Sequence, residues 1–216
     1  LINILELEKE ALNDIQLSLA VADSLALTSQ LALENKALAA INGGFFNIDK
    51  GNSVSFIEIN DQLVTPMLSD SEMLNASLVI EKMGDIIIQY ALQDSIYLES
   101  KTEEAILGAG PLLLQNAYKI PINQKRFSTL RHPRTCICER EKDILLITID
   151  GRRPNAFGMS LYELQDYLLS LACIDAINLD GGGSTTMWIK DKGIVNQPSD
   201  FNGERKVSNA VIISAK

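Results

Sequence analysis

Two aspartates, each followed by glycine, stand where catalytic or binding groups are expected. Asp150 follows the apolar run 144–149, and Asp180 follows the apolar run 176–179. Between them, residues 160–171 begin with a Ser-x-x-Glu capping box and continue with leucines at helical spacing. This pattern predicts a right-handed crossover between parallel strands, whose carboxyl ends face one cleft. The two carboxylates would lie roughly 5 Å apart on neighbouring strands, or about twice that with a strand between them.

The segment after Asp180 is rich in glycine and hydroxyl residues. Three consecutive glycines cost backbone entropy, so they fit a place where the chain turns or approaches a ligand closely. Free N–H groups in such a turn bind anions. The segment matches neither the Walker A nor the dinucleotide-binding pattern, and a tight turn without a ligand is the alternative reading. The predicted binding residues are Gly181, Gly182, Gly183, Ser184 and Thr185.

A short basic cluster containing the single histidine of the chain precedes the predicted strand 136–138. Its members are Arg131, His132 and Arg134. A guanidinium group presents a planar fork suited to phosphate or carboxylate, and an imidazole suits acid–base chemistry. The alternatives are a surface ion-pair patch and a structural histidine.

Glycine and asparagine end the predicted strand 38–41, and a further asparagine enters the predicted strand 210–214. The glycines allow the chain to turn, and the amides offer donors and acceptors to a sugar-like ligand. The last asparagine could instead be a strand-entry residue. The residues concerned are Asn42, Gly43, Gly44 and Asn209.

Composition limits the class of protein. The chain has 216 residues, of which 46% are hydrophobic and 22% charged, as in an ordinary soluble globular domain. Its 19 basic and 28 acidic residues give a net charge of −9, which argues against nucleic-acid binding. No apolar run approaches the roughly 20 residues of a membrane span, so we expect no transmembrane segment. The chain begins at Leu1 and shows no signal sequence, so its compartment is not read directly.

These patterns predict a mixed α/β fold, α+β-like, with a single domain over residues 1–216. Its central mixed β-sheet would contain the βαβ crossover, with helices on the flanks. Alternating apolar residues from Ile15 to Val21 predict a half-buried strand, and residues 25–36 predict a short helix. Residues 54–97 predict a meander of antiparallel strands.

The three cysteines form neither an evident disulfide framework nor a metal pattern. Cys136 and Cys138 would share one strand face and are poorly placed to bridge each other. We therefore expect them and Cys173 to be small buried residues.

We also expect no metal and no cofactor. A single histidine excludes a multi-histidine site. The carboxylates of Asp150, Asp180 and Glu204 could bind Mg²⁺ or Ca²⁺, but no spacing signature supports such a site.

Taken together, these segments resemble the phosphodiester glycosidase family. In chain order the matching segments are 41–46, 108–113, 131–135, 150–152, 158–160 with the helix that follows, 178–187 and 204–210. They cover roughly residues 38–214, and the combination is far more specific than any one segment. The known animal member removes N-acetylglucosamine from a phosphodiester on lysosomal glycans. The resemblance implies a hydrolase that releases the sugar of a sugar 1-phosphodiester and leaves the phosphate on the acceptor.

A phosphate monoester is already a good leaving group, so the site must mainly hold an anion and stabilise an oxocarbenium-like transition state. Asp180 would stabilise charge at the anomeric carbon or act as nucleophile, and Asp150 would orient a group or activate water. The remaining roles are phosphate binding by Arg134, His132 and the backbone of residues 181–184, and binding of sugar hydroxyls by Asn42 and Asn209.

Two alternative functions stay open. One is a phosphodiesterase that releases sugar 1-phosphate, and the other is a non-catalytic module that binds a sugar phosphate or glycan. The expected partner is a small molecule or glycan that carries a phosphodiester, while the sugar, the acceptor and the oligomeric state are not read from the sequence. The resemblance suggests an extracytoplasmic bacterial enzyme, periplasmic or on the cell surface, although cysteines without evident pairing fit the cytoplasm equally.

Overall fold

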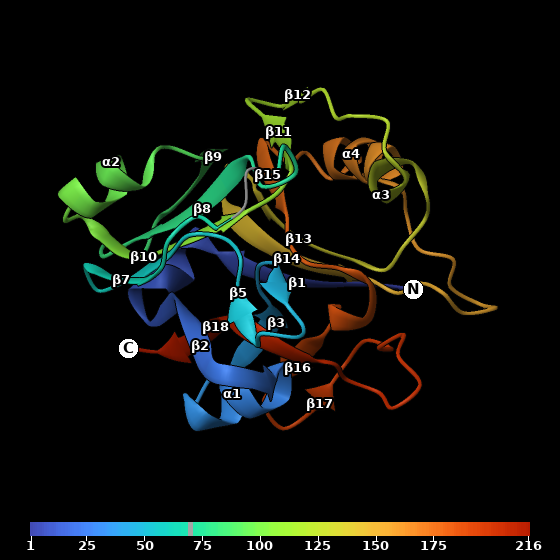
Figure 1. Cartoon of the computed structure of the whole chain (residues 1–216), viewed down its shortest axis with the longest axis horizontal. Helices are drawn as coiled ribbons and strands as arrows, with labels where there is room; N and C mark the ends of the chain where they lie inside the picture. Colours follow the sequence, from blue (N-terminus) through green and yellow to red (C-terminus); the bar gives the residue numbers. More distant parts are fainter. Residues whose placement is uncertain (69–70) are drawn as a thin grey trace.

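The computed structural model describes residues 1–68 and 71–216 and arranges them as three β-sheets around a shared apolar core, with short helices outside (Figure 1). Each sheet contributes to that core, for example through Leu146, Ile41 and Leu107, which have no exposed surface. Burial of this apolar area is the main force that holds the sheets together. The mixed α+β class and the single domain agree with the prediction.

Both aspartates follow strands of the first sheet, at the same end of those strands. Its strand order is β1 (Ile2–Glu8), β14 (Asp143–Ile149), β13 (Arg134–Glu139), β15 (Asp175–Asn178), β11 (Leu112–Gln115) and β12 (Tyr118–Lys119). β14 and β15 both pair antiparallel with β13, so they run in the same direction and are separated by one strand. Asp150 and Asp180 therefore follow the carboxyl ends of these two strands at the same end of the sheet, about 10 Å apart by strand spacing.

The expected mixed sheet is wrong in one respect, because every strand pair among the described residues is antiparallel. The reason is the tight turn over residues 140–142, where the Arg140 N–H donates to the Asp143 carbonyl. This turn folds β13 back beside β14. β13 thus takes the place that β15 would hold in a parallel pair.

The helix α4 (Leu161–Ser170) connects β14 to β15 as predicted. The Ser160 hydroxyl accepts from the Glu163 N–H at 3.2 Å, and the Glu163 carboxylate accepts from the Ser160 N–H at 2.9 Å. This capping box satisfies free donors of the first turn. Leu161, Leu164 and Leu168 are buried against the sheet.

The other two sheets supply the remaining strands that reach the site. One has the order β17 (Gly193–Ile194), β16 (Met187–Ile189), β3 (Ala39–Asn42), β18 (Lys206–Ala215) and β2 (Ile15–Leu27). The other has the order β7 (Gln62–Thr65), β6 (Ile57–Ile59), β10 (Glu103–Ala109), β8 (Ala76–Glu81) and β9 (Ile86–Tyr90). A small ribbon joins β4 (Phe46–Asn47) and β5 (Asn52–Ser53).

The short helices are α1 (Thr28–Glu34), α2 (Asp94–Glu99) and α3 (Arg126–Thr129), with 3-10 turns η1 (Lys9–Asn13) and η2 (Gly182–Ser184). Thr28 begins α1 three residues later than predicted, because Leu27 still pairs with β18. The antiparallel strands predicted over residues 54–97 are present, but they form two hairpins, β6–β7 and β8–β9, with β10 between them instead of one meander, and α2 follows. Ser69 and Asp70 fall within that range but outside the described residues. No helix in the described part of the chain has the length and apolar character to cross a bilayer.

The three cysteines are buried as predicted, but the expectation that they form no disulfide is wrong, because Cys138 and Cys173 are bonded with their Cα atoms 5.8 Å apart. Cys138 lies on β13, and Cys173 comes just before β15, its neighbour in the sheet. A separation of 35 residues gives no local signal of this proximity. Cys136 remains a buried free thiol on the α4 side of the sheet.

This pairing predicts a thiol count. Unfolded without reductant, the protein should react with one equivalent of a thiol reagent, and after reduction with three. Reductant should lower the free energy of unfolding by about 3–4 kcal/mol, because the bond closes a long loop in the unfolded chain. A Cys138→Ala/Cys173→Ala variant is the control and should show no further loss with reductant. Three reactive thiols before reduction would contradict the pairing.

Candidate active site

Segments far apart in the sequence meet where β3, β15 and β18 approach the start of β13. The Asp180 N–H donates to the Gly43 carbonyl at 3.0 Å, and the Gly43 N–H donates to the Asn209 carbonyl at 3.0 Å. The Gly182 N–H donates to the Pro133 carbonyl at 2.9 Å. Four of the segments singled out in the sequence therefore lie against one another.

Close packing explains the glycines of these segments. A Cβ atom on Gly43 would lie 2.0 Å from the Asn209 Oδ1 atom, and one on Gly181 would lie 2.6 Å from the Pro133 carbonyl oxygen. Gly151, after Asp150, is equally confined, since its Cβ would lie 2.7 Å from the Pro133 nitrogen. The close contacts that require glycine at these positions are thus contacts with other residues of the protein.

The backbone N–H groups of Gly181, Gly182, Ser184 and Thr185 do not form the open anion nest that the sequence predicts. The N–H groups of Gly181 and Gly182 donate to the Asp180 carboxylate and the Pro133 carbonyl. Those of Ser184 and Thr185 donate to carbonyls within the same turn, η2. Because these donors are already used, any anion at this turn must be held mainly by side chains.

Asp180 carries an unusual carboxyl group at the centre of this arrangement. Burial raises its pKa to about 6. The Ser184 hydroxyl, the Gly181 N–H, and the positive charges of Arg205 and Arg152 oppose that rise. Carboxyls with strongly raised pKa values beside specific charges gather at functional sites.

Two arginines face the glycine turn, although neither stands out in the sequence. A Cβ atom on Gly182 would lie 3.0 Å from the Arg152 Nη2 atom, and one on Gly183 would lie 2.3 Å from the Arg205 Nη2 atom. Asp200 orients Arg205 through two hydrogen bonds of 2.8 and 3.0 Å. Arg152 and Arg205 belong to segments that match the family pattern, but their proximity to Asp180 depends on the fold.

The predicted phosphate ligand Arg134 has a different position. Its side chain is 1% exposed and lies over the Phe127 ring at 4.8 Å. Its Nε atom donates to the Met159 carbonyl at 2.9 Å, and its Nη2 atom donates to the Phe127 and Leu130 carbonyls at 2.6 and 3.2 Å. Burial lowers its pKa to about 10, helped by the charge of Arg152, so it stays positive at neutral pH. Arg134 thus holds the segments of residues 127–130 and 159 together through their carbonyls, and we do not retain it as a phosphate ligand.

His132 is half-buried, within reach of the charges of Arg134 and Arg152. Its backbone pairs with that of Met159, and its Nδ1 atom is buried without a hydrogen-bond partner among the described residues. Burial lowers its pKa, as do the charges of Arg134 and Arg152. The imidazole is therefore neutral at pH 7, which suits hydrogen bonding and proton transfer better than electrostatic binding of phosphate.

Asn42 and Asn209 are fully buried and use their amides inside the protein. The Asn42 Nδ2 atom donates to the Asp180 carbonyl at 2.7 Å. The Asn209 Oδ1 atom accepts from the Gly44 N–H at 2.7 Å. Both hold the backbone of the site, which replaces the expected contact with sugar hydroxyls.

Asp150 is also buried, and a hydrogen-bonded network links it to the glycine turn. Its Oδ1 atom accepts from the Gln197 N–H at 2.9 Å and from Asn196 Nδ2 at 3.2 Å. Asn196 donates in turn to the Thr185 carbonyl at 2.9 Å. The Thr185 hydroxyl and the Asp150 Oδ2 atom have no partner among the described residues.

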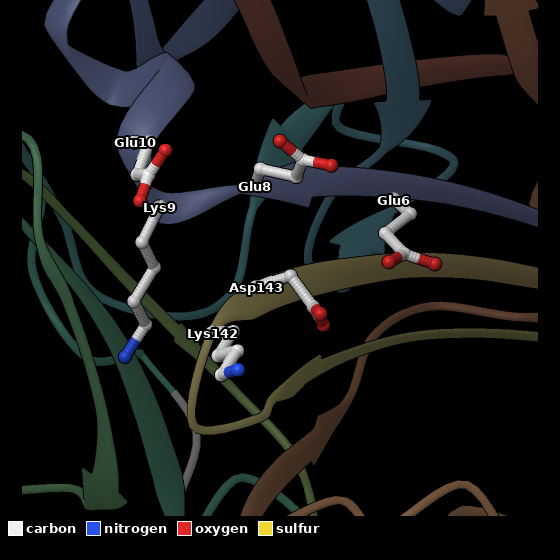
Figure 2. A pocket seen from close by; sticks show the side chains of 6 residues that line it. All are labelled: Glu6, Glu8, Lys9, Glu10, Lys142 and Asp143. Atoms are coloured by element: carbon white, nitrogen blue, oxygen red, sulfur yellow. The ribbon is translucent and has the colours of Figure 1, made fainter.

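A hollow on another part of the surface is lined mainly by charged side chains. Figure 2 shows its six side chains, which come from β1, the adjoining η1 turn, the turn before β14 and the first residue of β14: Glu6, Glu8, Lys9, Glu10, Lys142 and Asp143. It has a volume of about 510 Å³ and lies at the end of β14 away from Asp150. No group of three or more His, Cys, Asp or Glu side chains in residues 1–68 and 71–216 is arranged to hold a metal ion.

The chain belongs to a recognised family of proteins. The chain matches the phosphodiester glycosidase family over residues 35–214 and is a member of that family. It is 25% identical over 210 residues to N-acetylglucosamine-1-phosphodiester alpha-N-acetylglucosaminidase of Bos taurus. That match covers 87% of this chain and 39% of the bovine protein, so the chain spans about two fifths of this relative.

Two solved structures share the fold. The zebrafish N-acetylglucosamine-1-phosphodiester alpha-N-acetylglucosaminidase catalytic domain, auto-inhibited by its pro-peptide, superposes with a TM-score of 0.80 at 20% identity, over 100% of this chain and 83% of that chain. A putative exported protein of Burkholderia pseudomallei superposes with a TM-score of 0.70 at 16% identity, over 99% of this chain and 73% of that chain. At these identities the likeness supports the fold alone.

The raised pKa of Asp180 predicts how stability depends on pH. A folded-state pKa of about 6, against an ordinary 3.8, means that the folded protein holds this proton more tightly. The wild-type protein should therefore lose stability between pH 4 and pH 6 through this group, and the loss should persist above pH 6. Asp180→Asn should be more stable than the wild type at pH 8, on the order of 2 kcal/mol.

That difference should disappear near pH 4, where both side chains are neutral. Denaturant unfolding at the two pH values measures it. Asp166→Asn is the matched control, because this side chain is 70% exposed on α4. A destabilised Asp180→Asn protein at pH 8 would contradict the raised pKa.

Proposed function

We propose that this protein is a hydrolase that cleaves the glycosidic bond of a sugar 1-phosphodiester of the N-acetylglucosamine 1-phosphodiester class. It releases the sugar and leaves the phosphate on the acceptor. The observation that carries the proposal is the half-buried Asp180 carboxyl, whose pKa is raised, beside Arg152 and Arg205 at the glycine turn. Membership of the phosphodiester glycosidase family supports the reaction class.

In the proposed reaction the bond between the anomeric carbon and the bridging oxygen breaks. Its electron pair stays on that oxygen, so the leaving group is the acceptor's phosphate monoester. The guanidinium groups of Arg152 and Arg205 bind the phosphate and offset its growing negative charge. The ionised Asp180 carboxylate stabilises the positive charge that develops at the anomeric carbon, or attacks that carbon as nucleophile.

Water completes the reaction by adding hydroxyl to the anomeric carbon and giving up a proton; where Asp180 has attacked that carbon, the water also displaces the Asp180 carboxylate, which takes back its electron pair. The neutral imidazole of His132 is the proposed acceptor of that proton, since burial and two nearby arginines keep it uncharged. Asp150 serves as a positioning residue, because its carboxylate reaches the glycine turn through Asn196.

An extracytoplasmic location, periplasmic or on the surface of a bacterial cell, completes the proposal. The Cys138–Cys173 disulfide is a bond typical of oxidising compartments. The similar fold of a putative exported protein of Burkholderia pseudomallei is consistent with this location.

Turnover of a defined substrate tests the proposed reaction. N-acetylglucosamine 1-(methyl phosphate), with the sugar in the α configuration, should yield free sugar and methyl phosphate, identified by phosphorus NMR and mass. Asp180→Asn should lower kcat by about 100-fold or more, since the charge opposite the anomeric carbon is lost, while Asp166→Asn should not change it. Release of sugar 1-phosphate would identify a phosphodiesterase instead, and tight binding without turnover would identify a binding module.

The pH profile tests the protonation state of Asp180. If the carboxylate is the active form, kcat/KM should fall as the pH drops through about 6, the pKa of this group. The limb that belongs to Asp180 should be absent from the residual activity of Asp180→Asn, which leaves only the fall that protonation of His132 causes. A rate that instead falls as the pH rises through about 6 would make Asp180 a proton donor and contradict the assigned role.

A further inference from the structure

A second hollow lies beside the candidate active site, and the proposed chemistry does not use it. Its volume is about 370 Å³. Its lining is aromatic and aliphatic with one hydroxyl group, and consists of Phe45, Phe46, Val54, Ser71, Met73, Leu74 and Phe127. Substrate pockets commonly have this size and this predominance of apolar groups.

Two segments of the active site also form walls of this hollow. Phe45 comes two residues after Gly43, whose carbonyl accepts from the Asp180 N–H. Two residues of chain span at most about 7 Å, so the Phe45 backbone lies near that of Asp180. Phe127 belongs to the same wall, because its ring packs against that of Phe45 with the two centroids 6.1 Å apart.

The Phe127 wall is held in place from behind. The Arg134 guanidinium lies over one face of the Phe127 ring and also donates to the Phe127 carbonyl. Arg134 directly follows Pro133, whose carbonyl holds the Gly182 N–H. The hollow and the glycine turn are therefore fixed by the same backbone.

The side chains that line the hollow indicate which part of a sugar phosphodiester would bind there. Within residues 1–68 and 71–216, the side chains that line the hollow include none with a charge and one polar group, the Ser71 hydroxyl. A sugar placed there would have several hydroxyls facing apolar atoms, which costs free energy when they lack partners. An alkyl or aryl group would instead cover the half-buried faces of Phe45, Phe46 and Phe127 and gain from leaving water.

We propose that this hollow is an acceptor-side subsite for an apolar group. The inference rests on the proposed function. It identifies the substrates as sugar 1-phosphodiesters whose phosphate is esterified to an apolar alcohol. The sugar and phosphate lie at Asp180 and the two arginines, and the apolar part of the alcohol lies in the hollow against Phe45 and Phe127.

A homologous series of substrates tests the subsite. The probes are α-configured N-acetylglucosamine 1-phosphate diesters of methyl, butyl and octyl alcohol. The ratio of kcat/KM for each longer ester to that for the methyl ester should rise by up to about fourfold for each methylene that becomes buried, until the hollow is filled. Equal kcat/KM values for the methyl and octyl esters would overturn the inference.

The same Met→Gln substitution at two positions tests whether the preference for longer esters arises in the hollow. Met73→Gln keeps the side-chain length but places an amide in the hollow, so the octyl-to-methyl ratio should fall by about tenfold or more. Met83→Gln is the matched control, because that side chain is 84% exposed in the turn between β8 and β9, and it should keep the wild-type ratio. An unchanged ratio in folded Met73→Gln, checked by circular dichroism, would also overturn the inference.

A binding measurement separates this inference from the proposed reaction. Octyl phosphate should bind the wild-type protein at least tenfold more tightly than methyl phosphate, and Met73→Gln should reduce that preference. If no ester is hydrolysed but the preference is present, the proposed function fails and the subsite stands. If the esters are hydrolysed without any preference for alkyl length in rate or binding, the subsite fails and the proposed function stands.

Discussion

The carboxamide of Asn42 is the contact on which the candidate site depends. It has no exposed surface and joins three parts of the chain that are distant in sequence. Its Nδ2 atom donates to the Asp180 carbonyl at 2.7 Å, while its Oδ1 atom accepts from the Thr135 hydroxyl at 2.7 Å and from the Thr186 N–H at 3.1 Å. Buried polar groups left without partners are costly, so these bonds fix one arrangement of β3, β13 and the glycine turn.

Around this contact, a protein with a net charge of −9 concentrates positive charge at one carboxyl group. The arginines near this carboxyl group differ in burial and in what they contact. Arg134 is buried and satisfies backbone carbonyls, whereas Arg152 is exposed and Arg205 is partly exposed beside the glycine turn. The raised pKa of Asp180 indicates that burial outweighs these charges. Keeping a carboxylate there lowers stability at neutral pH, which is a common property of functional sites.

The sequence predicts the features that depend on local order. The capping box of α4, the fully buried strand β14 and the buried strands β3 and β15 follow from neighbouring residues and their periodicity. Features that depend on which strands become neighbours are not predicted in this way. Periodicity reports which face of a strand is buried but not which strand pairs with it, so the insertion of β13 and the Cys138–Cys173 bond appear only in the fold. The orientation of Arg134 and the positions of Arg152 and Arg205 depend on the same long-range pairing.

The central claim is that a sugar 1-phosphodiester binds with its anomeric carbon at Asp180 and its phosphate at Arg152 and Arg205. A crystal structure of Asp180→Asn soaked with intact α-configured N-acetylglucosamine 1-(methyl phosphate) tests it most directly. The account predicts the anomeric carbon in contact with the side chain of residue 180 and phosphate oxygens within hydrogen-bond distance of both guanidinium groups. Substrate bound elsewhere, with Arg152 and Arg205 making no contact to the phosphate, would contradict it.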